Sequence, residues 1–280
     1  MQAFKIIKPT HIFHLAASSS PAQSFKEPIK TLRNNIFGQI NILDAAQKFS
    51  PKSKILIVGS AEEYGQIEKG DKAINEEAIL EPSSPYAVSK VAQDFLGYQY
   101  YLHSNMHVVR VRPFNHIGPR QSPLFVVPAF ASQIAQIEQK GAGTIMVGNL
   151  NAYRDFTDVR DMVRAYLLAL EKGEVGQVYN IGSGKLVKIK NILDMLIAYS
   201  QAKINVKIDK NRYSKVEVKA ILCDFTKFKK ATGWQPTIPL KTTLFDTINY
   251  ERSKQEEPQR PTTKEFCISK IKFSSFQAIF

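Results

Sequence analysis

Hydrophobic residues form two alternating patterns in the first part of the chain. Three short apolar runs, at residues 10–17, 54–59 and 107–112, are bounded by polar or turn-forming residues. Runs of this length predict buried strands, and their nearly continuous apolar character is typical of strands that are covered on both faces.

Two longer segments between these strands have helical spacing. Residues 27–49 carry apolar side chains at every third or fourth position, which predicts a helix with one apolar face. Residues 86–104 are predicted to form a second helix, because Ser84 can cap its N-terminus and Pro85 suits its first position. Strands and helices that alternate in this way predict an α/β fold in which helices cover a parallel sheet.

The pattern is looser in the second half of the chain. Helices are predicted over residues 126–139, 158–171 and 189–201, and a strand is predicted over residues 177–181. Residues 255–280 begin with polar residues and then become apolar, so we expect an atypical tail there.

Composition indicates a folded protein away from membranes. The 280 residues are 44% hydrophobic and 22% charged, which is ordinary globular composition. No segment approaches the ~18 consecutive apolar residues of a membrane-spanning helix, and the N-terminus lacks the apolar region of a secretory signal. We therefore expect a cytoplasmic protein without membrane contact.

The net charge of +13 raises the question of a nucleic-acid partner. Lysines are scattered over polar segments, however, and are not grouped with aromatic residues that could stack on bases. A local basic excess over residues 201–240 suits a nucleoside diphosphate equally well, so we expect no nucleic-acid partner.

The cysteines and histidines predict no metal centre. Cys223 and Cys267 are too few for a disulfide framework. His103 and His107 have a metal-like spacing, but no third ligand completes the set. We therefore expect no bound metal.

The side chains best suited to catalysis lie after the second predicted strand and on the second predicted helix. Tyr86 and Lys90 are four residues apart, so they share a helical face, and a nearby cation is expected to lower the pKa of the phenol. Ser60 and Glu62 follow Gly59 at the carboxyl end of a strand, where open α/β sheets bind ligands. Ser60 is therefore predicted to contact the same substrate oxygen as Tyr86. By itself, the spacing of Tyr86 and Lys90 also fits an exposed tyrosine beside a solvated lysine.

A set of short segments has the order and spacing of a known family. The segments are residues 13–17, 35–38, 59–65, 86–90, 112–120, 154–161, 179–184 and 233–236. Together they resemble the extended short-chain dehydrogenase/reductases of the NAD-dependent epimerase/dehydratase family, which act on nucleotide sugars. The resemblance implies a Rossmann-like, doubly wound parallel sheet with a smaller mixed α/β portion that binds substrate.

The resemblance also implies roles for individual residues. It makes Ser60, Tyr86 and Lys90 the catalytic triad, with Glu62 available as a base at C5 of a sugar. The residues implied to contact NADP or NAD are Ala16, Ala17, Lys90, Phe114, His116 and Arg120. The residues implied to hold a GDP-sugar are Asn115, Arg154, Arg212 and Glu217.

Two departures from the family pattern stand out. The 280 residues contain no G-x-x-G-x-x-G turn, which holds the cofactor pyrophosphate at a helix N-terminus in this family. We therefore expect the sheet to lack its first two βα units, roughly sixty residues. Ser214 stands where the family has a diphosphate-binding arginine, so Arg212 or Lys215 can take that role only if the loop shifts.

These expectations define an organisation and a reaction. A truncated NAD(P)-binding domain is expected over residues 1–120. A substrate-binding portion, some of whose segments join the NAD(P)-binding domain, is expected over residues 121–254, and the tail over residues 255–280.

The implied reaction is the NAD(P)H-dependent reduction of GDP-4-keto-6-deoxy-D-mannose at C4. Dehydration of GDP-mannose and a non-catalytic remnant that binds a nucleotide sugar or a partner are the alternatives. The family also implies a homodimer in which residues 27–49 and 86–104 form a four-helix bundle.

Overall fold

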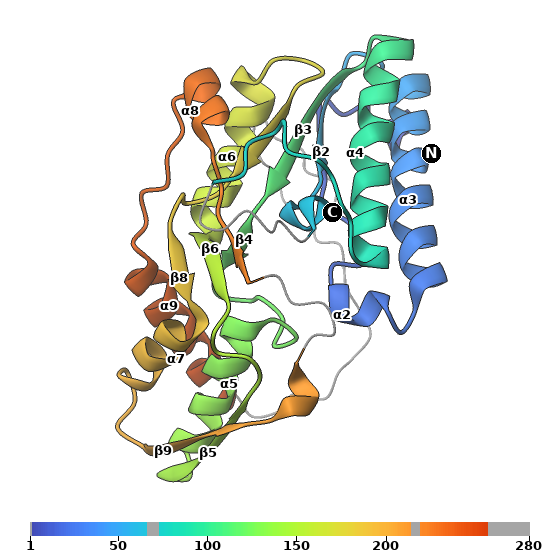
Figure 1. The fold of residues 1–280 in the computed structure, drawn as a ribbon. Coiled ribbons are helices and arrows are strands. Elements are labelled where there is room, and N and C mark those ends of the chain that lie inside the picture. Colours follow the sequence, from blue (N-terminus) through green and yellow to red (C-terminus); the bar gives the residue numbers. More distant parts are fainter. Residues whose placement is uncertain (1, 66–72, 214–218, 257–280) are drawn as a thin grey trace.

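A parallel sheet organises the first part of the molecule (Figure 1). The computed structural model describes residues 2–65, 73–213 and 219–256. The sheet has four strands in the order β1 (His11–His14), β2 (Lys54–Val58), β3 (His107–Pro113) and β7 (Val178–Ile181). All of its pairings are parallel, which confirms the α/β fold that the hydrophobic pattern predicts.

Helices cover both faces of this sheet. The helices are α3 (Pro28–Phe49) and α4 (Pro85–Ser104) on one face, and α6 (Val159–Lys172) and α8 (Thr226–Thr232) on the other (Figure 1). Side chains of β2 alternate between the two layers: Ile55 and Ile57 join the core under α3 and α4, and Leu56 joins the core under α6 and α8. This alternation is the period of two that a strand imposes.

Helix α4 begins where the sequence predicts. The Ser84 side chain accepts a hydrogen bond from Ala87 N at 3.0 Å, and Pro85 occupies the first turn. The cap satisfies a backbone N–H that would otherwise lack a helical partner.

The buried face of helix α3 matches the predicted apolar stripe toward its C-terminal end, where Leu43 and Ala46 are buried, and differs from it in the first turns. Ile29, which belongs to the predicted inward stripe, is 79% exposed. The buried side chains of the first turns are polar: Asn35 Nδ2 donates to Ser89 Oγ at 2.8 Å, and Gln39 Nε2 donates to Gln93 O at 2.5 Å. Because α4 presents polar groups to α3, amide side chains fit this contact better than isoleucines.

The remaining strands and helices form a second region around its own apolar core. Its strands are β4 (Asn115–Ile117), β5 (Ala142–Val147), β6 (Tyr153–Asp158), β8 (Leu186–Lys188), β9 (Lys203–Ile208) and β10 (Ala220–Ile221). Strand β6 pairs in parallel with β4 and β10 and antiparallel with β8, while β5 pairs in parallel with β9. The helices are α5 (Val126–Glu138), α7 (Ile189–Ile197) and α9 (Leu240–Glu256). The hydrophobic pattern predicts none of these six strands and does not predict α9, and it extends α7 beyond its true end.

Short helices complete the fold. They are α1 (Gln2–Ile7), α2 (Pro21–Ser24), and the single turns η1 (Ala61–Tyr64) and η2 (Lys210–Arg212). Turn η1 directly follows β2, and it carries the residues on which the candidate chemistry depends.

One buried carboxylate connects the two regions. Asp155 on β6 accepts hydrogen bonds from Ser183 N at 2.7 Å, Gly184 N at 2.8 Å and Cys223 N at 3.1 Å. These amides belong to the turn after β7 and to the segment after β10. A single side chain therefore attaches both segments to β6.

Two kinds of feature are absent from the described residues. No helix in residues 2–65, 73–213 and 219–256 has the length and apolar character needed to cross a membrane. In the same ranges, no three His, Cys, Asp or Glu side chains are grouped so that they could hold a metal ion.

Candidate active site

The turn after β2 has a tightly fixed conformation. Ser60 caps η1, with its Oγ accepting a hydrogen bond from Glu62 N at 3.2 Å. In the reverse direction, Ser60 N donates to Glu63 Oε1 at 2.7 Å. This reciprocal capping box orients the Ser60 side chain at the carboxyl end of the strand.

Helix α4 brings a phenol and an ammonium to the same place. The Tyr86 phenol is buried and hydrogen-bonded to the Ser60 side chain. Lys90 Nζ donates to Val58 O at 2.9 Å and lies 5.9 Å from the centroid of the Tyr86 ring. Ser60, Tyr86 and Lys90 thus form one buried cluster, so the reading of Tyr86 and Lys90 as an exposed pair is wrong.

The electrostatics of this cluster differ from the prediction. Burial raises the pKa of Tyr86 well above its usual value, and the nearby Glu62 and Glu63 raise it further. The predicted lowering by a cation is therefore wrong for the structure, because desolvation of the phenolate dominates. Burial lowers the pKa of Lys90 to about 8, with Glu63 opposing the shift. Lys90 is thus the member of the pair that titrates nearer to neutral pH.

Glu62 is close enough to both Tyr86 and Arg154 of β6 for their charges to interact. Burial raises the pKa of the Glu62 carboxyl, and the positive charge of Arg154 opposes this shift. The fold thus brings together two residues that are about ninety positions apart in sequence. Asp158, at the end of β6, caps α6 and pairs with Arg160 at 2.8 Å.

Small residues follow the end of β1. Ala16 is exposed and Ala17 is half-buried, and Leu15 separates them from His14, the last residue of the strand. Next to them, the buried His14 ring has its pKa lowered to about 4 by burial and by the charge of Lys90. The imidazole is therefore neutral at physiological pH, and it adds no positive charge to this edge.

The segment after β3, which includes strand β4, carries the three remaining predicted cofactor residues. Phe114 is buried against Tyr64, with ring centroids 6.4 Å apart. His116 Nδ1 lies 3.2 Å from Phe114 O, and burial lowers the pKa of its ring. Asn115 and Arg120 are exposed, and Arg120 has a φ of 72°, in the left-handed region. The segment therefore presents Asn115 and Arg120 to solvent while it buries the phenylalanine.

Of the two residues predicted to hold the diphosphate, Arg212 lies in the described part of the chain and Glu217 does not. Arg212 is exposed on η2, and its Nε lies 3.5 Å from Asp209 Oδ2. Ser214 and Lys215 also lie outside the described residues.

Sequence reasoning missed a buried ion network beneath the cluster. Asp94 on α4 contacts Arg110 NH1 at 2.7 Å and Arg112 NH2 at 2.5 Å. Arg112 Nε also lies 3.1 Å from Glu63 Oε2, and its NH1 donates to Tyr64 OH at 3.0 Å. Two arginines at alternate positions of an otherwise apolar strand were the available signal, because buried arginine requires partners.

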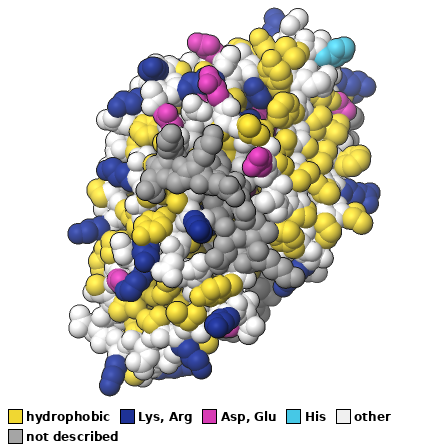
Figure 2. Space-filling view, viewed as in Figure 1, with side chains coloured by type: hydrophobic (Ala, Val, Ile, Leu, Met, Phe, Trp, Pro, Cys, Tyr) yellow, Lys and Arg dark blue, Asp and Glu magenta, His cyan; other side chains and the backbone are white. Residues whose placement is uncertain are grey.

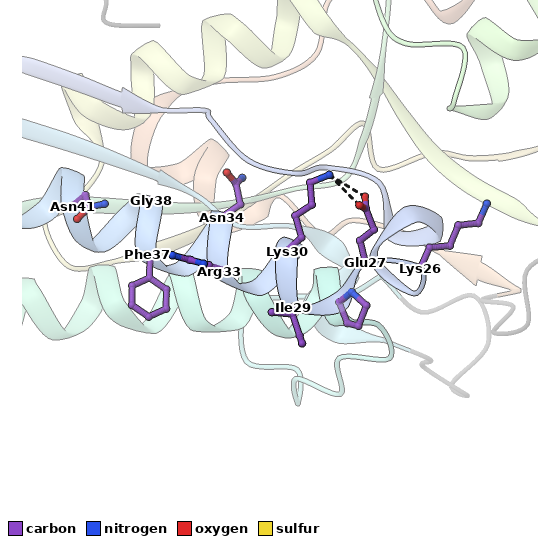
Figure 3. A pocket seen from close by; sticks show the side chains of 10 residues that line it. Lys26, Glu27, Ile29, Lys30, Arg33, Asn34, Phe37, Gly38 and Asn41 are labelled. Atoms are coloured by element: carbon purple, nitrogen blue, oxygen red, sulfur yellow. Dashed lines mark hydrogen bonds and ion pairs between the residues drawn. The ribbon is translucent and has the colours of Figure 1, made fainter.

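A surface hollow lies elsewhere on the molecule. It has a volume of about 800 Å³ and runs along the first turns of α3 (Figure 3). Phe37, Arg33 and the ion pair of Lys30 with Glu27 are part of its lining, and none of the predicted site residues is. The hollow is therefore separate from the cluster around Tyr86.

Comparison with known proteins identifies the family. A family model described as GDP-mannose 4,6 dehydratase matches residues 1–247. The chain is 35% identical over 250 residues to the GDP-6-deoxy-D-mannose reductase of Pseudomonas aeruginosa, covering 89% of this chain and 82% of the relative.

Solved structures agree with the sequence comparison. RMD from Pseudomonas aeruginosa complexed with NADPH has a TM-score of 0.82 and 34% identity, over 88% of this chain and 82% of that one. The UDP-glucose 4-epimerase of Thermotoga maritima with UDP-glucose has a TM-score of 0.80 and 27% identity, over 91% of this chain and 81% of that one. These matches confirm the resemblance that the motifs indicate: the chain belongs to the extended short-chain dehydrogenase/reductases of the NAD-dependent epimerase/dehydratase family.

Proposed function

We propose that this protein reduces GDP-4-keto-6-deoxy-D-mannose at C4, with NADPH or NADH as the reductant. The observation that carries the proposal is the buried phenol of Tyr86, hydrogen-bonded to Ser60 and adjacent to Lys90 at the carboxyl end of β2. The 35% identity to a GDP-6-deoxy-D-mannose reductase supports this choice within the family.

The residues at this edge fit the nicotinamide end of such a cofactor. Ala16 and Ala17 leave space beside the end of β1, and Lys90 offers an ammonium that can bind ribose hydroxyls. Phe114, His116 and Arg120 would lie along the same edge. The bound cofactor supplies the hydride that reduces C4.

Tyr86 acts as the proton donor in this proposal. Its raised pKa keeps the phenol protonated at neutral pH, so the proton is available for the alkoxide oxygen that forms at C4. Ser60 orients the same oxygen by a hydrogen bond. Lys90 stabilises the phenolate that remains, because it places a positive charge beside the ring in a site with little water.

Polar groups on the second region would hold the nucleotide sugar. Arg154 lies near Glu62 and so near the reacting carbon, and Asn115 is exposed on β4 beside β6. Arg212, together with Glu217, would contact the diphosphate.

Dehydration of GDP-mannose is the second candidate. It is favoured by the family model and by Glu62, a half-buried carboxyl with a raised pKa that could remove the C5 proton. The deciding experiment supplies GDP-4-keto-6-deoxy-D-mannose with NADPH or NADH, and GDP-mannose with NADP or NAD, and identifies the products by mass spectrometry. A reductase converts the keto sugar, and Glu62→Gln keeps most of that rate. A dehydratase converts GDP-mannose and loses nearly all turnover in Glu62→Gln.

Binding without turnover is the third outcome of this experiment. Calorimetry with GDP and with NADPH separates it from the other two, since a non-catalytic remnant binds GDP and produces neither sugar.

A second copy of this chain is the proposed protein partner. Figure 2 shows hydrophobic side chains over the side of the molecule that α3 and α4 form in Figure 1. The exposed ones on these helices are Ile29, Phe37, Val88, Phe95 and Leu102. An apolar face of two parallel-packed helices suits a two-fold, four-helix contact. Light scattering should find a dimer for the wild type and a monomer for Phe95→Asp, and a monomeric wild type contradicts the idea.

A further inference from the structure

Glu63 is a fully buried carboxylate that the proposed reaction does not use. Its side chain has 0% exposure, and its Oε1 accepts a hydrogen bond from Ser60 N at 2.7 Å. Its Oε2 lies 3.1 Å from Arg112 Nε. A Cβ at Gly59 would stand 2.3 Å from Glu63 Oε1, so the glycine leaves the space that the carboxylate fills.

The charges around Glu63 explain why a carboxylate is needed there. Asp94 is shared between Arg110 and Arg112, so these three side chains alone leave an excess positive charge in the interior. Lys90 adds a further buried positive charge from α4. A carboxylate at position 63 balances this excess, and an uncompensated buried charge is costly.

The charges of Glu63 and Lys90 each shift the pKa of the other residue. Burial and the charge of Asp94 raise the pKa of Glu63, while Arg112 and Lys90 oppose that shift. In turn, Glu63 is the group that raises the pKa of Lys90 against the effect of burial. Two further titratable groups lie near Lys90: the neutral ring of His14, from β1, and the Tyr86 phenol, whose ring centroid is 5.9 Å from Lys90 Nζ.

We propose that Glu63 is a positioning residue, which holds the Ser60 backbone in place and supplies negative charge opposite the buried cations Arg112 and Lys90. Its value for catalysis rests on the proposed function, because only a reaction at Tyr86 needs a cation beside the phenol. The positioning itself is a property of the folded chain, so it can be measured without turnover.

The first test measures the pKa of Lys90 in the full chain. Competitive acetylation with acetic anhydride across pH, with mass spectrometry of the peptide that carries Lys90, gives the midpoint at which its amine becomes reactive. Glu63→Gln should lower this midpoint by about one pH unit, a tenfold change in the acid dissociation constant. Glu76→Gln is the matched control, because Glu76 Oε1 also accepts a backbone hydrogen bond at 2.7 Å, from Asn180 N.

The labelling result separates this inference from the proposed function. An unchanged midpoint in Glu63→Gln, or an equal shift in Glu76→Gln, overturns the positioning role whether or not the protein turns over sugar. If the protein reduces the keto sugar, Glu63→Gln should lower kcat and shift its pH profile while KM stays nearly constant. Absence of turnover in the wild type refutes the proposed function. The labelling result then decides by itself whether Glu63 has the positioning role.

A measurement on the wild type covers the case in which Glu63→Gln does not fold. Residue-resolved hydrogen exchange should show the Ser60 amide protected, because its hydrogen is bonded to a buried carboxylate. Exchange of this amide at the rate of an unstructured peptide overturns the proposal.

Discussion

The two faces of the four-stranded sheet have different chemistry. Under α3 and α4, the sheet buries the charged side chains Arg110 and Arg112 against Asp94, close to the residues of the candidate site. Under α6 and α8, it buries aromatic rings, among them Trp234 and Phe228 with centroids 5.6 Å apart. A buried charge requires fixed partners, whereas rings require only close packing. The first face is therefore suited to holding reacting groups in place, and the second to stabilising the fold.

The largest effect is expected on activity, at the first face. Tyr86→Phe keeps the ring and its packing but removes the exchangeable proton, so turnover of the keto sugar should fall by about 10²–10⁴-fold. The midpoint of thermal unfolding should change little. Steady-state rates and a melting curve on the same preparation test the expected loss of turnover and the expected unchanged stability. A variant with half of the wild-type rate contradicts the role of Tyr86.

A large effect on stability is expected at the second face. The Trp234 indole packs edge-on against Phe225 at 5.7 Å, and its Nε1 donates to Asp161 O at 3.1 Å. Trp234→Ala should lower the free energy of unfolding by about 3–5 kcal/mol, as measured by urea denaturation. Turnover per folded molecule should stay close to that of the wild type. A loss of rate without a loss of stability would show that the two faces do not divide their roles in this way.

A pH-dependent effect is expected from His14, on the first face. In the unfolded chain its ring binds a proton near pH 6.5, but in the folded chain it does so only near pH 4. Between these values the unfolded state binds more protons, so the His14 contribution to stability is complete above about pH 6.5 and is lost as the pH falls toward 4. The linkage amounts to about 3 kcal/mol.

Paired unfolding curves isolate this contribution. His14→Gln removes the titrating ring, so the difference in unfolding free energy between the wild type and the variant should shrink as the pH falls from 7 to 4. The pKa of Glu63 is raised, so its titration makes the unfolding free energy change with pH in the opposite direction. Both proteins contain Glu63, so this contribution cancels in the difference between them. A difference that is constant over this range refutes the assignment to His14.

The smallest effect is expected at the polar contact between α3 and α4. Asn35 Oδ1 accepts from Ser18 N at 2.7 Å, and Asn35 Nδ2 donates to Ser89 Oγ. Asn35→Leu leaves these partners without the amide and should lower the free energy of unfolding by about 1–3 kcal/mol. Asn41→Leu makes the same exchange at an exposed position of α3 and should change stability by less than about 0.5 kcal/mol. Equal effects in both variants would mean that the buried amide has no special role.

The sequence predicts those features whose causes are local. The start of α4 follows from Ser84 and Pro85, which act on the backbone beside them. The buried face of the first turns of α3 could not be predicted in the same way, because it depends on polar groups of α4. The pKa of Tyr86 was predicted in the wrong direction because the spacing to Lys90 is visible in the sequence, but the burial of the phenol is not.

The contact between Arg112 and Glu63 was missed for a related reason. The two residues are far apart in sequence, and only the pairing of β2 with β3 brings them together. The motifs of the family located Ser60 and Tyr86, but they carry no information about the counter-ions that support them. Short strands such as β10, with two residues, are too brief for a hydrophobic period to indicate.

Asp155 also links the strand that carries Arg154 to the central sheet. It is the neighbour of Arg154 on β6, and its carboxylate accepts hydrogen bonds from the amides of Ser183, Gly184 and Cys223. Ser183 and Gly184 follow β7, which pairs with β3 in the central sheet. The backbone beside Arg154 is therefore connected through one side chain to the sheet that carries Ser60.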